Sequence, residues 1–392
     1  MGNGRHHVRH CRRADLQPGV DRRRGRLHDL FVEQLSRHLR RRLRVIPARK
    51  ISGRAPAVCP SAAGARPFPR RHCPRHRVRP GRSEHMSAPT GGAQQDLQGD
   101  YHRRLFHALH DWERSWAGAL DVAGDRSRAH ALGLDQLGHF GAQGCELVAD
   151  AIVAAAPTGA PITLAELGCG FGGALRAVVD RLSRRDVTVR TAVGLDFVAD
   201  HVQLFATIEA QRAADTGART RVGAAPWTAH PVQADVRALP LRTASLDVAV
   251  CTGSLSHFAR TDAVFAEAAR VLRPGGLLVM TDEAGLLGPG GEPSETFRRL
   301  HPPGIFFLTG VETRVAQLRA AGFTDVRLRE LTDWACALLH DRLKVMRLFF
   351  GDLAAIYGSD EARTLLDTLT VARDEYRRGA IVPALVTARL PV

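Results

Sequence analysis

One short stretch of the chain combines an acid with a sharp, glycine-rich turn. Residues 164–173 read LAELGCGFGG, in which an apolar run ends at Glu166 and four glycines follow within six residues. Glycine lets the backbone turn sharply and come close to a ligand, and the N–H groups of a helix that begins at such a turn favour an anion. We therefore predict a strand that ends here, a helix that starts here and a cofactor bound between the two.

The elements needed to hold such a turn alternate along the chain. We predict strands over 162–167, 187–196, 230–235, 246–252 and 276–282, separated by helices over 173–182, 198–214 and 261–272. Repeated strand–helix units form a parallel sheet with helices on both faces. The sequence thus predicts an α/β fold, a Rossmann-like doubly wound sheet, whose ligands bind beyond the carboxyl ends of the strands. Those ends carry Glu166, Asp196, Asp235, Thr252 and Asp282.

Further helices and strands extend this unit on both sides. Apolar residues at helical spacing predict helices over 101–120, 138–156 and 310–323, and a helical cap over about 334–378. Segments 324–331 and 381–390 are candidate antiparallel strands at the end of the sheet. We therefore expect N-terminal helices over 86–157, followed over 158–392 by a domain whose sheet is mostly parallel with an antiparallel C-terminal strand.

The glycine spacing fits two classes of cofactor. The G-x-G-x-x-G of residues 168–173 matches the fingerprint of nicotinamide dinucleotide sites, so an NAD(P)-dependent oxidoreductase is one alternative. A carboxylate at the strand end would repel a dinucleotide pyrophosphate. S-adenosylmethionine (SAM) instead combines a sulfonium, an ammonium and one carboxylate, which suits Glu166. Asp196 can accept hydrogen bonds from both ribose hydroxyls, and Asp235 can accept one from the adenine amino group.

Four motifs, in order, resemble those of class I SAM-dependent methyltransferases. ELGCGFGG resembles their first motif, GLDF their acidic second strand, QADVRALPLRTASLDVAV their adenine-binding aspartate with the fourth strand, and RVLRPGGLLVMTD their fifth strand. The resemblance covers about 162–330. It implies a methyltransferase with SAM as its cofactor, held by Glu166, Gly168, Gly170, Gly172, Asp196, Phe197, Asp235, Val236 and Thr252.

The loop after the fourth predicted strand bears on the methyl acceptor. Residues 251–258 read CTGSLSHF and lack the N/D-P-P-Y/F motif of methyltransferases that act on base amino groups. This loop resembles small-molecule methyltransferases of natural-product and sugar O-methylation type, and the resemblance makes His257 the expected general base and Asp282 its partner. The expected substrate is a small molecule, namely a hydroxyl-bearing secondary metabolite. The C-terminal part also resembles glycine- and sarcosine-type N-methyltransferases, which keeps N-methylation as an alternative.

The positive charge of the chain is confined to its first segment. Residues 1–85 hold 23 Lys and Arg against 5 Asp and Glu, a net charge of +18, whereas the rest holds 32 against 35, a net charge of −3. The segment is rich in Arg, Pro and His, and such composition predicts a disordered tail, which could also be non-native. It has few aromatic residues to stack on bases, so we expect no nucleic-acid partner.

The remaining composition indicates a soluble, cytoplasmic protein. Seven cysteines are scattered without a C-x-x-C pair, which predicts no metal site, and no apolar run has the length of a membrane span. No membrane partner is expected, and a homodimer stays open.

The charge partition generates the first prediction. A chain that starts at Met86 should fold, melt at nearly the same temperature as the full chain and bind SAM equally well, because the globular function is expected after residue 85. Thermal melts and calorimetry of both proteins check this. A large loss of melting temperature in the shorter protein would show that the first segment stabilises the fold.

Overall fold

The computed structural model describes residues 96–101, 136, 138–155, 160–217 and 227–392. The predicted tail over 1–85 and almost all of the predicted helix over 101–120 lie outside the described residues. Residues 96–101 are helical.

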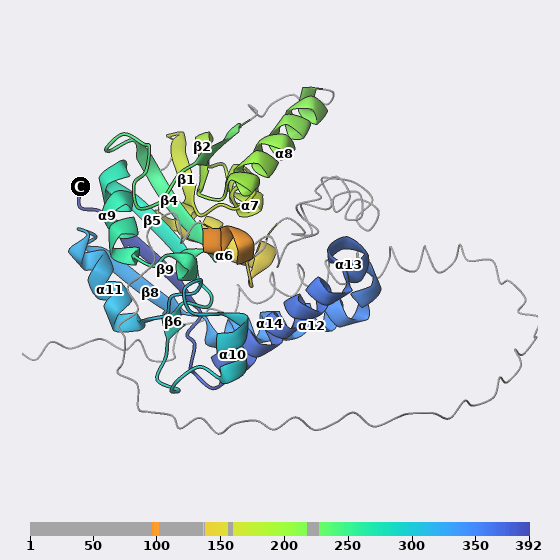
Figure 1. Ribbon diagram of the computed structural model, residues 1–392. Helices are drawn as coiled ribbons and strands as arrows, with labels where there is room; N and C mark the ends of the chain where they lie inside the picture. Colours follow the sequence, from red (N-terminus) through yellow and green to blue (C-terminus); the bar gives the residue numbers. More distant parts are fainter. Residues whose placement is uncertain (1–95, 102–135, 137, 156–159, 218–226) are drawn as a thin grey trace, which may run out of the picture. The chain divides into compact units, whose positions relative to one another are not determined.

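Seven strands of the described chain form one sheet (Figure 1). They are β1 (Ile162–Leu167), β2 (Val189–Asp196), β3 (Ala229–Gln233), β4 (Leu246–Thr252), β5 (Leu272–Asp282), β8 (Asp325–Glu330) and β9 (Ala384–Arg389). Their order is β3-β2-β1-β4-β5-β9-β8, and β9 is antiparallel to both of its neighbours while the other pairs are parallel. The predicted Rossmann-like sheet with an antiparallel C-terminal strand is thereby confirmed.

Two of the differences between the observed and the predicted strand bounds concern β5 and β3. β5 begins at Leu272 rather than at 276, because the RPGG segment is a bulge inside the strand: Leu246 pairs with Leu272, and Val248 already pairs with Leu277. β3 ends at Gln233, so Asp235 lies in the turn beyond the strand rather than at its last position.

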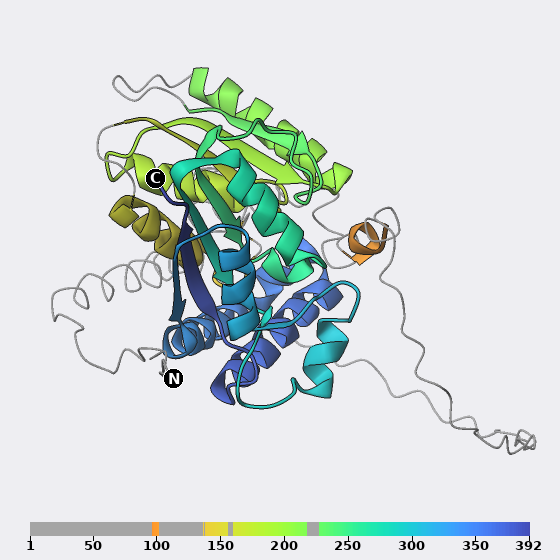
Figure 2. The same ribbon diagram turned by 90° about the vertical axis from the view of Figure 1, so that its left-hand side faces the viewer.

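Helices cover both faces of the sheet, and alternation along the strands divides the core accordingly. On one face lie α6 (Gly141–Ala155), α7 (Gly173–Ser183) and α8 (Ala199–Gly217), packed on a cluster that includes Val248 and Val250 of β4. On the other lie α9 (Thr261–Val271) and α11 (Val311–Ala320), packed with Ala249 and Cys251 (Figure 2). Successive side chains of a strand point to opposite faces, so both faces of β4 are buried.

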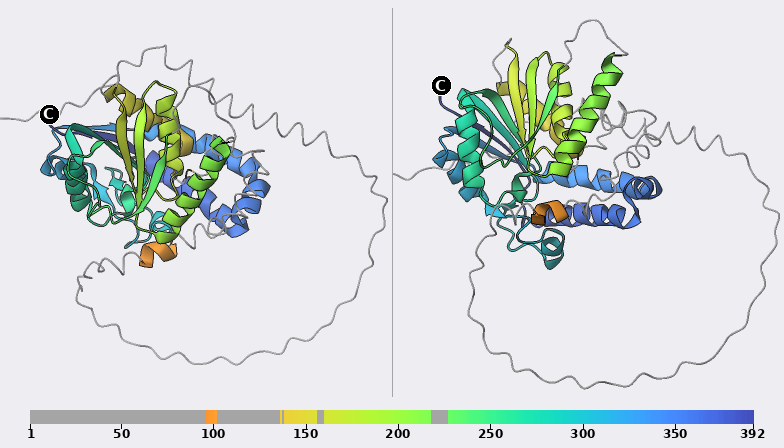
Figure 3. Two further views of the ribbon diagram at one scale, coloured as in Figure 1. Left: turned by 90° about the horizontal axis from the view of Figure 1, so that it is seen from above. Right: turned by 45° about the horizontal axis from the view of Figure 1, so that its top comes forward.

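The remaining elements lie at the carboxyl end of the sheet. They are η1 (Leu255–His257), β6 (Leu286–Leu287), α10 (Glu295–Leu300), β7 (Thr309–Gly310), α12 (Thr332–Leu348), α13 (Phe350–Tyr357) and α14 (Ser359–Arg377). The long helices α12 and α14 run beside each other across one end of the strands (Figure 3). Helices thus occupy most of the range 334–378, and the role of this range as a cap over the site stays a prediction.

A buried ion pair joins the end of β5 to α11. Arg314 donates to the carboxylate of Asp282 over 3.2 Å, and both side chains are sealed from solvent. Asp282 also accepts from the backbone N–H of Gly285 over 2.8 Å. Burial raises the pKa of the Asp282 carboxyl, and the Arg314 guanidinium opposes that rise. The pair fixes the start of the loop that follows β5.

This pair generates a stability prediction. Arg314→Met should lower the free energy of unfolding by about 3–5 kcal/mol, because a buried carboxylate then lacks its partner. The double variant Arg314→Met with Asp282→Leu should recover most of that loss, since neither charge remains buried. Urea titrations at pH 7 measure both. A single variant as stable as the wild type would contradict the assigned role.

Candidate active site

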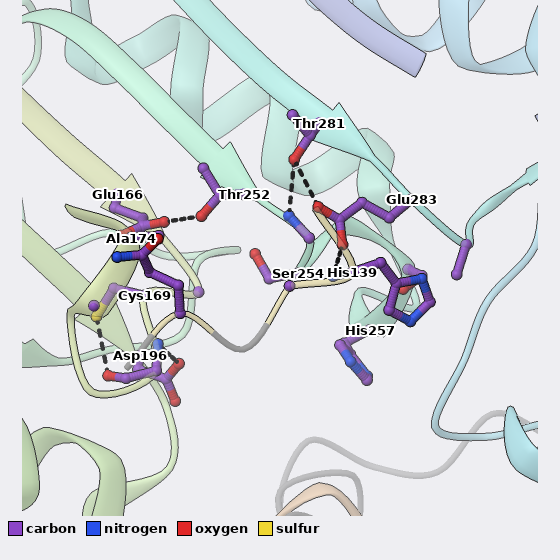
Figure 4. Close-up of a pocket in the computed structure, with 18 of the residues that line it drawn as sticks. His139, Glu166, Cys169, Ala174, Asp196, Thr252, Ser254, His257, Thr281 and Glu283 are labelled. Atoms are coloured by element: carbon purple, nitrogen blue, oxygen red, sulfur yellow. Dashed lines mark hydrogen bonds between the residues drawn. The ribbon is translucent and has the colours of Figure 1, made fainter. Parts of the chain in front are cut away.

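One pocket lies at the carboxyl ends of β1, β2, β4 and β5, as the doubly wound fold requires (Figure 4). Its wall includes predicted cofactor residues from the strand ends and residues from the cap, such as Leu365 and Thr368 of α14. Of the residues predicted from the sequence, it brings together Glu166, Gly168, Gly170, Asp196, Phe197, Val236, Thr252 and His257.

The glycine turn after β1 has the conformation that its residues predict. Gly168, Gly170 and Gly172 all have positive φ, of +72°, +53° and +81°. A Cβ on Gly172 would lie 2.5 Å from the ring of Phe205, so that position also has no space for a side chain. Gly172 precedes the first residue of α7 and shapes the turn, but it is not part of the pocket wall.

Asp196 fastens the turn from the neighbouring strand. Its Oδ2 accepts from the N–H of Gly170 over 2.8 Å, and its Oδ1 accepts from the N–H of Val198 over 2.9 Å. His201 lies 3.4 Å from the same carboxylate. The carboxylate is therefore rigidly held at the edge of the pocket, where a ligand with hydroxyl groups can reach its remaining lone pairs.

Glu166 is buried at the end of β1 and shares its carboxylate with β4. Its Oε1 accepts from the hydroxyl of Thr252, whereas its Oε2 is buried without a partner among the described residues. Burial raises the pKa of Glu166 to about 8, despite the hydrogen bond from Thr252. A bound cation would stabilise the carboxylate and so oppose this rise, which suits the site to a ligand with a positive group.

Asp235 differs from the sequence-based expectation. Its carboxylate is taken up by the guanidinium of Arg237, at 3.0 and 2.6 Å, and by the backbone N–H of the same residue, so its pKa is lowered. Asp235 is not part of the pocket wall, while its neighbour Val236 and the aromatic Phe197 are. The difference follows from the earlier end of β3, which turns Asp235 toward Arg237.

His257 lies in η1 with its ring on the pocket wall. Its Nδ1 is 3.3 Å from the carbonyl oxygen of Ile305, and a carbonyl can only accept, so Nδ1 carries the hydrogen. Its ring contacts that of Phe306 at a centroid distance of 4.4 Å. Burial lowers the pKa of His257 to about 4, below the near-neutral value typical of a histidine base. The imidazole is thus neutral at pH 7.

The structure does not bring Asp282 to His257. Its carboxylate is buried against Arg314, and the pocket wall holds its neighbours Thr281 and Glu283 instead. Because side chains alternate along a strand, Asp282 turns toward α11 while both neighbours face the pocket. The position of Asp282 therefore gives no support to its expected role as a partner of His257, and the same alternation could have pointed to Glu283.

Glu283 lies on the pocket wall and connects several segments there, a role that the sequence did not indicate. Its carboxylate accepts from the backbone N–H of His139, and burial raises its pKa to about 7. Tyr376 of α14 donates its hydroxyl to the carbonyl of Glu283 and lies 3.2 Å from Nδ1 of His139. Arg342 of α12 donates to the carbonyl of His139 over 2.8 Å. Sheet, cap and N-terminal segment thus meet at His139.

Two general features of the described residues bear on partners. They contain no group of three or more His, Cys, Asp or Glu arranged to hold a metal ion. Among them, no helix combines the length and the apolar character of a membrane span.

Comparisons with known proteins agree with this geometry. A family model described as a methyltransferase domain matches residues 165–280, which contain the glycine turn, the acid at the end of β2 and the loop after β4. The match decides between the two cofactors that the glycine spacing left open. No curated protein matches the chain.

Solved structures are similar in fold. One is phosphoethanolamine N-methyltransferase 2 of Haemonchus contortus, in complex with phosphomonomethylethanolamine and S-adenosylhomocysteine. It has a TM-score of 0.52 and 17% identity, with 62% of this chain and 52% of that chain covered. Another is a protein from Galdieria sulphuraria assigned as a sarcosine dimethylglycine methyltransferase, with a TM-score of 0.50, 16% identity, and 64% and 85% of the two chains covered.

The chain spans about half the length of the first of these structures, and at such identities the likeness concerns the fold. The family match to residues 165–280 also indicates the activity, because it covers the strands that carry the glycine turn and Glu166. The chain carries a methyltransferase domain of the class I, SAM-dependent type.

Proposed function

We propose that this domain transfers the methyl group of SAM to a hydroxyl of a small molecule, a secondary metabolite, with His257 as the general base. The observation that carries the proposal is the position of His257 on the pocket wall, with a fixed tautomer. Because Nδ1 donates to the carbonyl of Ile305, the unprotonated nitrogen is Nε2. That atom is the one able to take a proton.

The residues at the strand ends fit the parts of SAM. Glu166, with its unpartnered oxygen, suits the ammonium group, and the backbone of Gly168 and Gly170 suits the carboxylate. Asp196 is held where it can accept from ribose hydroxyls, and Phe197 and Val236 offer apolar surface to adenine. An adenine contact to Asp235 requires Arg237 to release part of that carboxylate.

When bound, SAM supplies an electrophilic methyl group with a good leaving group. The chain then has to position the acceptor in line and take up its proton. His257 is neutral at pH 7 and so is ready to accept that proton without losing one first. Its buried surroundings disfavour the imidazolium, so the proton should move as the C–O bond forms rather than beforehand.

An amine acceptor is the second candidate, and Glu283 is the observation in its favour. A carboxylate with a pKa of about 7 on the pocket wall can balance the charge of a substrate ammonium. The two candidates are separated by where the product carries its methyl group, on oxygen or on nitrogen.

Glu166 generates a prediction about SAM binding. Because the free carboxyl has a pKa of about 8, SAM must displace a proton when it binds below that pH. Affinity should therefore rise with pH between 6 and 7.5, by up to about tenfold per unit, and binding should release a proton. Calorimetry in two buffers of different ionisation enthalpy measures this release. Glu166→Gln should bind more weakly and release none, and proton release unchanged in that variant would assign it elsewhere.

His257 generates the test of the proposed reaction. His257→Ala should lower kcat by about 10² to 10⁴ and leave SAM affinity nearly unchanged, with a smaller loss at high pH, where the acceptor ionises unaided. In the wild type at saturating SAM, the low pKa of His257 predicts no fall in kcat between pH 9 and pH 6, because the base stays unprotonated throughout.

The matched control is His340→Ala, on the exposed side of α12, which should behave as wild type. Turnover of His257→Ala equal to the wild type across this range would sink His257 as the base.

A further inference from the structure

The end of the pocket away from the glycine turn is lined by rings and amides from distant segments. We call it the acceptor end and define it by Gln98, Tyr101, His139, His257, His301 and Phe306, all of which line the pocket. His257 and His301 both contact the ring of Phe306, at centroid distances of 4.4 and 4.6 Å. The two histidines therefore belong to one surface.

Gln98 has a fixed amide orientation and a spare acceptor. Its side-chain nitrogen donates to the carbonyl of Ile305 over 2.8 Å and lies 3.4 Å from the carbonyl of His257. Both partners can only accept, so the amide nitrogen must face them and the amide oxygen must face away. That oxygen is buried without a partner among the described residues, in a side chain with 0% exposure.

His301 also has a fixed orientation and a spare acceptor. Its Nδ1 is 3.1 Å from the carbonyl of Phe297, so it carries the hydrogen, and its ring stacks on that of Phe297 at 4.0 Å. Its Nε2 is then a bare acceptor, buried and without a partner in the described part of the chain. Burial lowers the pKa of His301 to about 4, so the ring does not become a donor at neutral pH.

Unpartnered buried acceptors are rare in folded proteins because each one forfeits its hydrogen bonds to water. Two of them, on Gln98 and His301, occur at the acceptor end on separate segments of the chain. A ligand with O–H groups would satisfy both. A phosphate or carboxylate would instead place further lone pairs beside these atoms and near the carboxylate of Glu283, which lines the same pocket.

We infer that Gln98 and His301 select the acceptor: they bind a neutral, polyhydroxylated small molecule through hydroxyl groups other than the one that is methylated, and they reject its phosphorylated form. This inference rests on the proposed function, and it assigns anchoring rather than proton transfer to the two residues. Sites built to bind a substrate hydroxyl discriminate strongly against analogues that lack it.

The test uses the full chain saturated with S-adenosylhomocysteine and a panel of neutral diols and polyols. Catechol, 1,2-cyclohexanediol and methyl glucoside are each compared with a mono-deoxy analogue and a phosphate monoester, first for binding by calorimetry and then for transfer of a labelled methyl group from SAM. At least one neutral compound should bind at least about tenfold more tightly than both of its partners. A phosphate ester or deoxy analogue that binds equally well, or a panel without any neutral binder, would overturn the inference.

Variants separate anchoring from a purely structural role. Gln98→Met and His301→Phe should keep the affinity for S-adenosylhomocysteine, and each should reduce the preference for the diol over its deoxy analogue by about tenfold. Gln203→Met on α8 and His340→Phe on α12 change the same residue types at exposed positions and should leave the preference intact. An unchanged preference in Gln98→Met and His301→Phe would also overturn the inference.

Nitrogen NMR of the histidine rings supplies a readout that does not need turnover. The Nε2 resonance of His301 should move when the binding diol is added and should not move with its phosphate ester. Failure of the proposed function looks different: the methyl group would be found on nitrogen or carbon while the diol preference persisted.

Discussion

The glycine turn between β1 and α7 is the feature on which the rest of the site depends, because neighbouring elements pack directly against its backbone. A Cβ at Gly172 or Gly194 would lie within 2.6 Å of the Phe205 ring, and one at Gly168 would meet Ser254 at 2.7 Å. Because these glycines have no side chains, Phe205 of α8 packs directly against the backbone of the turn and of β2. Ser254, in the loop after β4, packs against the backbone of Gly168 in the same way. Because Asp196 holds the N–H of Gly170, this closeness also fixes an acidic group beside the backbone that receives the cofactor.

Burial then sets the protonation states of the groups around this turn. Removing water raises the pKa of Glu166 to about 8 and of Glu283 to about 7, and it lowers the pKa of His257 and His301 to about 4. At neutral pH the pocket thus holds neutral rings and carboxyls that ionise readily when a cation arrives. Such a site suits a donor that is cationic and an acceptor that is neutral.

The cap is coupled to the sheet through hydrogen bonds rather than through sequence neighbours. Glu283, directly after β5, Arg342 from α12 and Tyr376 from α14 all contact His139. Gly138 and Gly253 leave space for the Glu283 carboxylate, since a Cβ at either would lie 3.0 to 3.1 Å from its oxygens. A displacement of α12 or α14 would therefore move His139, which belongs to the acceptor end of the pocket.

The sequence by itself determined the sheet, the glycine turn and the acids at the ends of β1 and β2, because strand–helix alternation and glycine spacing are local patterns. It did not show that Asp282 pairs with Arg314 and Asp235 with Arg237, since the direction of a side chain at a strand end depends on which helix or turn it meets. Gln98 and His301 carried no local signal at all. They lie more than 200 residues apart, and only the tertiary structure brings them to one pocket and leaves each with an unpartnered acceptor.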